Sequence, residues 1–152
     1  MKKLILFSSN KDVKELDVQK IFVNNRLKDE WIEIENKTIA SFKNILLKLE
    51  LENNEIIYML IDTLLVKSDD SEVTFYYHEY LETFEQFENK NLLKTINKEY
   101  KETKRKMQYI KALQNIKTSY FDETEIELLE KKLYKLKAQL YFSLSYKELK
   151  WN

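Results

Sequence analysis

The sequence contains no glycine and no proline in its 152 residues. Average usage of about 7% Gly and 5% Pro would give roughly 18 such residues in a chain of this length. Glycine supplies the positive φ of tight hairpin turns, and proline marks strand edges and interrupts helices. Helices joined by Asn- and Asp-rich turns need neither residue, so this double absence favours a mainly helical fold.

The same absences exclude several chemistries. Without Gly there is no phosphate-binding loop of the Walker or dinucleotide type, no nucleophile elbow and no standard EF-hand loop. Without Cys there is no disulfide, thiolate metal site or cysteine nucleophile. His78 is the single histidine, and we expect an ordinary surface residue rather than a metal or acid–base pair with Glu82. We therefore expect no cofactor, no metal and no enzymatic activity. An enzyme that works with carboxylates alone ranks third, after the two binding functions described below.

Composition and hydropathy indicate one compact cytoplasmic domain over residues 1–152, since domains cluster at about 100–150 residues. The longest apolar stretch, 56–66, carries Asp62 and is too short to span a bilayer. The amino-terminal apolar run, Leu4 to Phe7, is too short for a secretion signal. We expect no association with membranes.

The last third of the chain has the clearest helical pattern. Apolar residues recur there at alternating steps of three and four, at Ile126, Leu129, Leu133, Leu136 and Leu140. A second seam precedes them, at Leu93, Ile96, Tyr100, Met107 and Ile110. This spacing is typical of helices that pack side by side. A turn at 118–122, ending in a capping-box sequence that begins at Asp122, separates them, so we predict antiparallel helices over about 90–118 and 123–149.

The first half of the chain is less regular. Residues 10–23 and 38–52 carry apolar spacings that indicate helices, whereas 55–66 and 72–77 fit either a helix or a strand. The sequence as a whole predicts a small, mainly α helical bundle with a long C-terminal helical hairpin. It leaves open a small accessory β element in the N-terminal half.

Charge is balanced overall but unevenly distributed. The chain has 26 basic and 26 acidic residues, yet residues 69–89 contain no Lys or Arg. A basic stripe, which we define as Lys94, Lys98, Lys101 and Arg105, shares one face of the predicted helix. The stripe suits contact with nucleic acid. We favour instead a pairing with the acidic residues of segment 72–88, which would fold back alongside the stripe if that segment is a helix.

The acidic segment is also rich in aromatic residues, more than the buried stripe of one helix needs. Exposed tyrosines beside carboxylates are typical of protein-binding surfaces. The candidate partner-binding residues are Tyr76, Tyr77, Glu79, Tyr80 and Glu82. We predict a non-enzymatic protein–protein interaction module, a small regulator, inhibitor or immunity-type protein that binds a protein partner or a second copy of itself. Its composition suits a low-G+C bacterium, a phage or a mobile element. The alternative is a helical subunit of a larger complex that contacts nucleic acid through 94–105.

Overall fold

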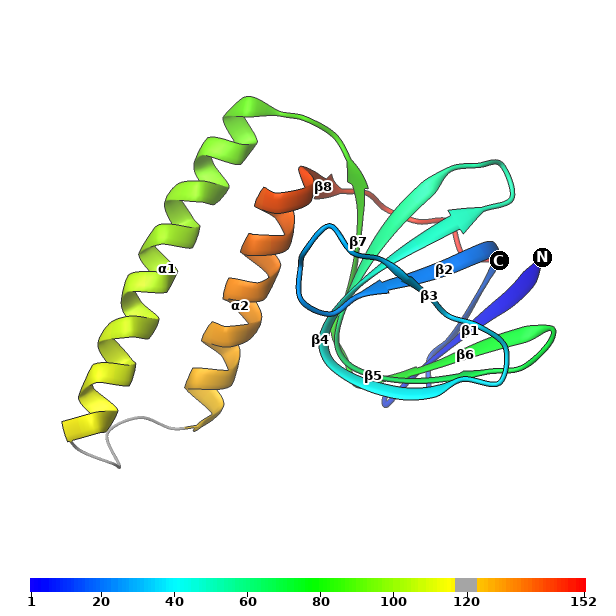
Figure 1. The fold of residues 1–152 in the computed structure, drawn as a ribbon, viewed down its shortest axis with the longest axis horizontal. Coiled ribbons are helices and arrows are strands. Elements are labelled where there is room, and N and C mark those ends of the chain that lie inside the picture. Colours follow the sequence, from blue (N-terminus) through cyan, green and yellow to red (C-terminus); the bar gives the residue numbers. More distant parts are fainter. Residues whose placement is uncertain (117–122) are drawn as a thin grey trace. The chain divides into compact units, whose positions relative to one another are not determined.

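The computed structural model describes residues 1–116 and 123–152, and its regular structure is mostly β, with 42% strand and 32% helix (Figure 1). The prediction of a mainly α helical bundle is therefore wrong. The chain divides into two compact units, a β unit of residues 1–86 and 145–152 and a helical unit of residues 87–144. The single domain over 1–152 stays a prediction. No helix in the described ranges is long and apolar enough to cross a membrane.

Strands far apart in the sequence pair to build one mixed sheet. Its members in the described residues are β1 (Lys2–Ser8), β2 (Val13–Asn24), β3 (Ile32–Glu33), β4 (Ile39–Leu51), β5 (Ile56–Ser68), β6 (Glu72–Tyr77), β7 (Leu81–Gln86) and β8 (Leu144–Tyr146). β1 lies between β2 and β6, and β5 lies between β6 and β4. Because β4 also pairs with β2, these five strands close into a ring.

The long strands β2, β4 and β5 bend, and each contributes to two layers. β2 pairs with β1 through residues 13–18 and with β4 through 18–24, with a register shift beside Gln19. Asn44 interrupts the β4–β5 ladder with a φ of 52°. Such irregularities kink a strand. The first layer therefore contains β1, β6 and the adjoining halves of the long strands, and the second contains the other halves with β3 and β7. Side chains from both layers form the core, including Leu4, Leu6, Val18, Ile21, Leu47, Met59, Ile61, Val66, Val73 and Phe75.

The helices predicted over 10–23 and 38–52 are strands β2 and β4, for a physical reason. In β2 the buried apolar residues stand at 16, 18, 21 and 23, because the register shift inserts a step of three into the two-residue alternation. In β4, Leu46 is buried on one face while Ile45 and Leu47 are buried on the other. Both patterns resemble helical periodicity. The ambiguous segments 55–66 and 72–77 are strands β5 and β6.

The argument from missing glycine failed because other residues take its place in turns. Lys11, Leu27, Lys37, Asn54 and Ser143 all have φ between 53° and 67°. A non-glycine residue in this left-handed region costs about 1–2 kcal/mol. Asn54 recovers part of that cost, since its N–H donates to the carbonyl of Leu51 at 3.0 Å and closes the β4–β5 hairpin.

The predicted C-terminal helical hairpin is confirmed. Helices α1 (Lys90–Ile116) and α2 (Glu123–Phe142) pack antiparallel, with Met107, Ile110 and Leu129 in a shared core. Across the hairpin, Lys132 pairs with Glu99 at 3.0 Å. α2 ends seven residues before the predicted 149, where Ser143 adopts a left-handed φ of 53° that stops a helix. The predicted turn at 118–122, with Asp122 of the capping box, lies outside the described residues.

Candidate functional site

The outer face of the first layer carries exposed apolar side chains on five neighbouring strands. Tyr76 of β6 lies opposite Phe7 of β1 and Leu65 of β5, and Phe7 in turn lies opposite Val13 of β2. Residues directly opposite one another share a face of the sheet. Ile39 belongs to the same face, because its partner Lys67 stands two residues beyond Leu65. We call Phe7, Val13, Ile39, Leu65 and Tyr76 the apolar band.

The apolar band is open to solvent. Tyr76 is 45% exposed, Leu65 44% and Val13 54%. The ring of Phe7 stacks on that of Tyr76, with 5.5 Å between centroids and 15° between planes. Single exposed apolar residues are ordinary, whereas a contiguous group centred on an aromatic is typical of a protein interface. The band is therefore the strongest candidate site in the β unit.

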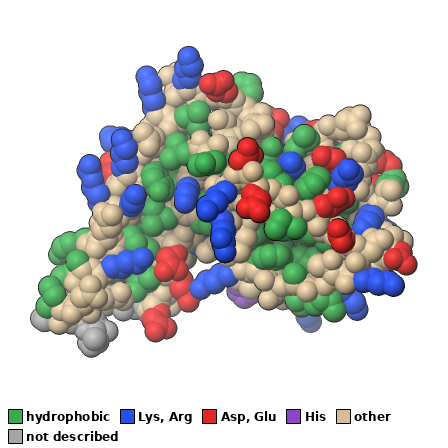
Figure 2. Space-filling model, viewed as in Figure 1, with side chains coloured by type: hydrophobic (Ala, Val, Ile, Leu, Met, Phe, Trp, Pro, Cys, Tyr) green, Lys and Arg blue, Asp and Glu red, His purple; other side chains and the backbone are tan. Residues whose placement is uncertain are grey.

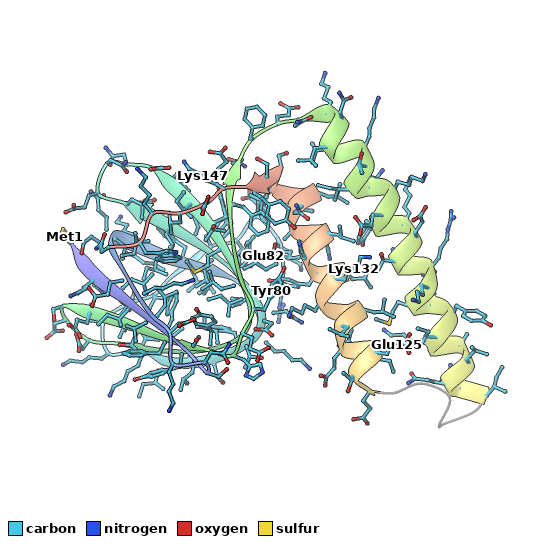
Figure 3. All side chains as sticks on the ribbon, turned by 180° about the vertical axis from the view of Figure 1, so that it is seen from behind. Met1, Tyr80, Glu82, Glu125, Lys132 and Lys147 are labelled. Carbon is cyan, nitrogen blue, oxygen red and sulfur yellow. The ribbon has the colours of Figure 1, made fainter. Side chains whose placement is uncertain are left out.

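The structure separates the five predicted partner-binding residues. Tyr76 lies in the apolar band, while its neighbour Tyr77 points to the core and is 7% exposed, and burial raises the pKa of its hydroxyl. Glu79 is exposed in the loop between β6 and β7. Tyr80 and Glu82 lie side by side (Figure 3), and the pKa of Tyr80 is raised by burial and then by its hydrogen bond to that carboxylate.

His78 borders the apolar band, beside Tyr76 and Leu65. His78 lies in the loop between β6 and β7. A pairing with Glu82 would need both residues one turn apart on a helix, and this segment is not helical. Its backbone carbonyl accepts hydrogen bonds from the N–H of Ser9 at 3.0 Å and from its Oγ at 2.6 Å. Among residues 1–116 and 123–152, no three His, Asp or Glu side chains gather closely enough to hold a metal ion.

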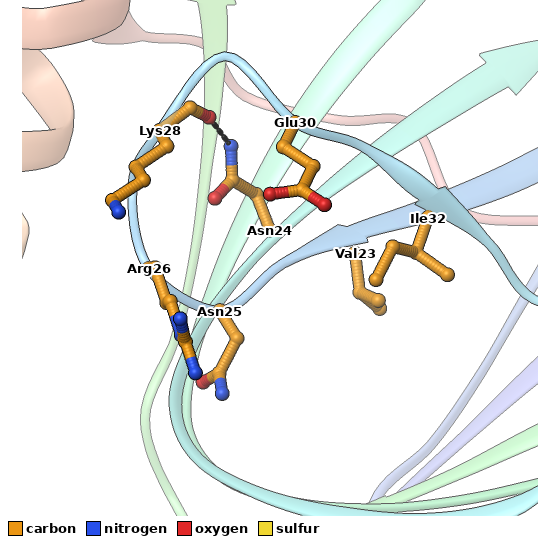
Figure 4. A pocket seen from close by; sticks show the side chains of 7 residues that line it. All are labelled: Val23, Asn24, Asn25, Arg26, Lys28, Glu30 and Ile32. Atoms are coloured by element: carbon orange, nitrogen blue, oxygen red, sulfur yellow. Dashed lines mark hydrogen bonds between the residues drawn. The ribbon is translucent and has the colours of Figure 1, made fainter.

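A polar pocket of about 390 Å³ lies at the loop between β2 and β3 (Figure 4). Asn24, which is buried, donates its side-chain amide to the carbonyl of Lys28. Leu27, between them, adopts a left-handed φ of 53°. The amide thus holds the loop in a conformation that its own residues disfavour, and this explains the buried polar side chain structurally.

The basic stripe lies on α1 as predicted, and all four of its residues are exposed. Figure 2 shows Lys and Arg side chains gathered along this helix. Within the described ranges, none of the four forms an ion pair. The predicted pairing with an acidic helix over 72–88 is wrong, because that segment forms β6 and β7. One of its carboxylates, Glu85, instead lies 3.5 Å from Lys147.

Residues 145–152, which we call the C-terminal segment, fasten back onto the β unit. The N–H of Lys147 donates to the carbonyl of Thr83 at 3.1 Å, and that of Asn152 donates to Glu15 at 2.9 Å. The side chain of Lys147 pairs with Glu55 as well as Glu85. Leu149 and Trp151 pack against the core, and Lys14 lies 5.2 Å from the Trp151 ring centroid.

The Lys147 cluster predicts a pH-dependent contribution to stability. Its hydrogen bond to Glu55 lowers the pKa of that carboxyl and raises the pKa of Lys147. The contribution is complete above the unfolded carboxyl value of about 4.3 and below the unfolded lysine value of about 10.4. It is lost as the pH falls through the folded pKa of Glu55 or rises through that of Lys147. Lys147→Met should therefore destabilise slightly at pH 7 and not at the extremes, as urea titrations at several pH values would measure. A difference that is independent of pH would contradict this account.

The apolar band escaped sequence reasoning, apart from Tyr76. Its members come from five strands, and only the strand register brings them together. A local signal did exist in β1, where Leu4 and Leu6 are buried while Ile5 and Phe7 face outward. An unbroken run of apolar residues conceals that alternation, because both faces of the strand are apolar.

Comparison with known proteins finds a similar fold among solved structures and matches more than half of the chain to a family. No curated protein matches the sequence. A chain in the cryo-EM structure of the Euglena gracilis mitochondrial ATP synthase, OSCP/F1/c-ring in rotational state 1, is similar with a TM-score of 0.52. The two are 12% identical, and the match covers 89% of this chain and 76% of that one. Residues 2–82, more than half of the chain, match the UU051 N-terminal domain, so the chain belongs to that family.

Proposed function

We propose that the chain is a non-enzymatic protein-interaction module that acts in the cytoplasm and docks on a protein partner through the apolar band. The observation that carries the proposal is the exposure of Tyr76 and Leu65 at the centre of the band. Aromatic side chains in the middle of an interface supply much of its binding energy, since they bury large areas at little cost in conformational entropy.

The surroundings of the band suit an interface rim. Lys43 and Lys67 are exposed on β4 and β5 beside the apolar residues, and Ser41 lies opposite Leu65. A ring of polar and charged residues around an apolar centre is the usual anatomy of a specific interface. The rim gives orientation and specificity, whereas the aromatic centre gives affinity.

A subunit role within a larger assembly is the form of this function that we favour. The similar Euglena chain comes from a structure described as an ATP synthase with OSCP, F1 and c-ring. A fold that is used inside a multi-subunit machine supports a permanent partner more than a free regulator, inhibitor or immunity-type protein.

The test is site-specific photo-crosslinking in cells of the source organism. A photoreactive phenylalanine at position 76 should capture a discrete protein, and the same residue in place of Tyr109 should not. Tyr109 is the matched control, since it is 64% exposed on α1, outside the β unit. Tyr76→Ala combined with Leu65→Ala should weaken the isolated complex by about 30-fold, as expected for hot-spot residues. Equal capture from both positions, or unchanged affinity of the double variant, would refute the proposal.

Contact with nucleic acid through the basic stripe is the second candidate, favoured by the exposure of all four of its residues. The same experiment separates the two functions when it is repeated after nuclease treatment. A partner that is lost with the nucleic acid, and lost in Lys98→Glu with Lys101→Glu, belongs to the stripe. The salt dependence of such binding should flatten by about 0.7–0.9 units of log–log slope for each phosphate contact removed.

A further inference from the structure

The helical unit carries a groove between α1 and α2, with a volume of about 400 Å³. The α1 wall runs from Tyr100 to Lys111 and the α2 wall from Glu130 to Lys137. At 1.5 Å per residue the α1 wall is about 17 Å long, which equals about three turns of another helix. All of the lining residues belong to the helical unit, so the groove exists independently of the β unit.

The floor of the groove is apolar and aromatic. Met107 is buried at its base, while Leu133 and the rings of Tyr100 and Tyr134 are half-buried along its sides. A Met and two Tyr side chains give a surface that adapts to apolar residues while offering hydroxyl groups at its edge. A floor of this kind receives side chains spaced at i, i+3, i+4 and i+7 from an amphipathic helix.

The rim of the groove is predominantly basic. Lys104 and Lys111 from α1 and Lys137 from α2 are exposed, and Glu130 is the one acidic residue in the lining. Within the described part of the chain, these three lysines form no ion pair, although Lys104 lies 6.0 Å from the ring centroid of Tyr100. The three lysines are therefore available to carboxylates of another molecule.

We propose that this groove binds an amphipathic helix of a partner protein whose apolar face is flanked by Asp or Glu residues. The apolar floor takes the Leu-type side chains, and the three rim lysines select carboxylates on either side of them. The inference deepens the proposed function by naming a second contact with a protein partner, on residues that the apolar band does not share.

A protein helix fits the groove better than nucleic acid does. Phosphates would engage the lysines, but the buried Met107 and the half-buried Leu133 offer nothing to a phosphate backbone. The basic stripe lies on a different face, about 100° around α1 from the groove at 3.6 residues per turn. The basic rim alone would accept either ligand, whereas the apolar floor together with the basic rim selects an amphipathic protein helix.

The experiment measures binding of a synthetic helical peptide to the full chain by fluorescence anisotropy at physiological ionic strength. The probe places Leu at i, i+3, i+4 and i+7 and Glu beside them. One comparison peptide has the same composition with the Leu pattern scrambled, and another has Lys in place of every Glu. We expect the probe to bind at least about tenfold more tightly than either comparison peptide, because floor and rim must both be matched.

Two matched sets of variants locate the site. Reversing Lys104, Lys111 and Lys137 to Glu should weaken probe binding at least about tenfold, whereas reversing Lys94, Lys98 and Arg105 should weaken it less than about threefold. Both sets change the net charge equally at exposed positions, and circular dichroism checks that the helices persist. Tyr100→Ala, which retains every charge, should also weaken binding, and Tyr109→Ala should not.

Equal weakening by the two charge-reversal sets, equal binding of the scrambled peptide, or displacement of the probe by a DNA duplex would each overturn the inference. Tyr76→Ala should leave probe affinity unchanged, because the apolar band is not part of the groove. The failure of one proposal is thus distinguishable from the failure of the other.

Discussion

Replacing Phe75 by alanine should lower the free energy of unfolding by about 3–5 kcal/mol, the usual cost of removing a buried phenylalanine. Phe75 is fully buried in β6, and its ring lies in the core formed by both layers of the β unit. The lost ring leaves a cavity that rigid strands on both sides cannot fill. Urea denaturation followed by circular dichroism measures the change as a lower midpoint at constant slope.

The adjacent residue provides the control for this prediction. Tyr76→Ala removes a side chain of similar size from the opposite face of the same strand, where it is 45% exposed and stacks on Phe7. Its cost should stay within about 1 kcal/mol, the value of a stacked aromatic pair near the surface. If the two variants were equally unstable, the alternation of β6 between core and solvent would be incorrect.

Truncation after Tyr146 should destabilise the protein about as much as the loss of the Phe75 ring, although it leaves both helices intact. It removes Leu149 and Trp151 from the core and breaks the backbone bonds of Lys147 with Thr83 and of Asn152 with Glu15. Half-burial of two large apolar side chains, with these hydrogen bonds, corresponds to about 3–5 kcal/mol. The thermal midpoint should fall by about 10–20 °C.

A matched variant tests whether the apolar contacts are responsible. Glu148→Ala with Lys150→Ala alters the two exposed residues that alternate with Leu149 and Trp151, and it should be nearly neutral. Trp151→Ala alone should reproduce a large part of the truncation, including loss of the Lys14 contact with the ring. A truncated chain that melts at the wild-type temperature would show that the C-terminal segment does not contribute to the fold.

The helical hairpin could be predicted from the sequence because its information is local. Seams of apolar residues at steps of three and four identify both helices, and the charges of α1 follow the same geometry. The β unit could not be predicted in this way. Its parallel pair, β1 with β6, joins residues about seventy positions apart, and no local pattern reports such a pairing.

The composition also led to a wrong fold prediction, because other residues take the place of glycine in the turns. Asn and Lys adopt the left-handed conformation in turns of this chain, so the absence of Gly did not exclude a sheet. The candidate sites follow the same division. The basic stripe and Tyr76 could be identified along one helix or one strand, whereas the rest of the apolar band required the register between strands. Tyr77 was predicted to bind a partner but is buried, because successive side chains of a strand point to opposite faces and Tyr77 follows the exposed Tyr76.

The helical unit is an insertion whose two ends meet. The chain leaves the β unit after Gln86 and returns at Ser145, and just inside those points the N–H of Phe87 donates to the carbonyl of Ser143 at 2.9 Å. Because its two ends are joined, the hairpin behaves as one closed loop of the β unit. Doubling the length of such a loop costs only about 0.6 kcal/mol in closure entropy. The match to the UU051 N-terminal domain stops at residue 82, shortly before the insertion begins. A hairpin of another length or sequence could therefore take its place while the C-terminal segment continues to close the same β unit.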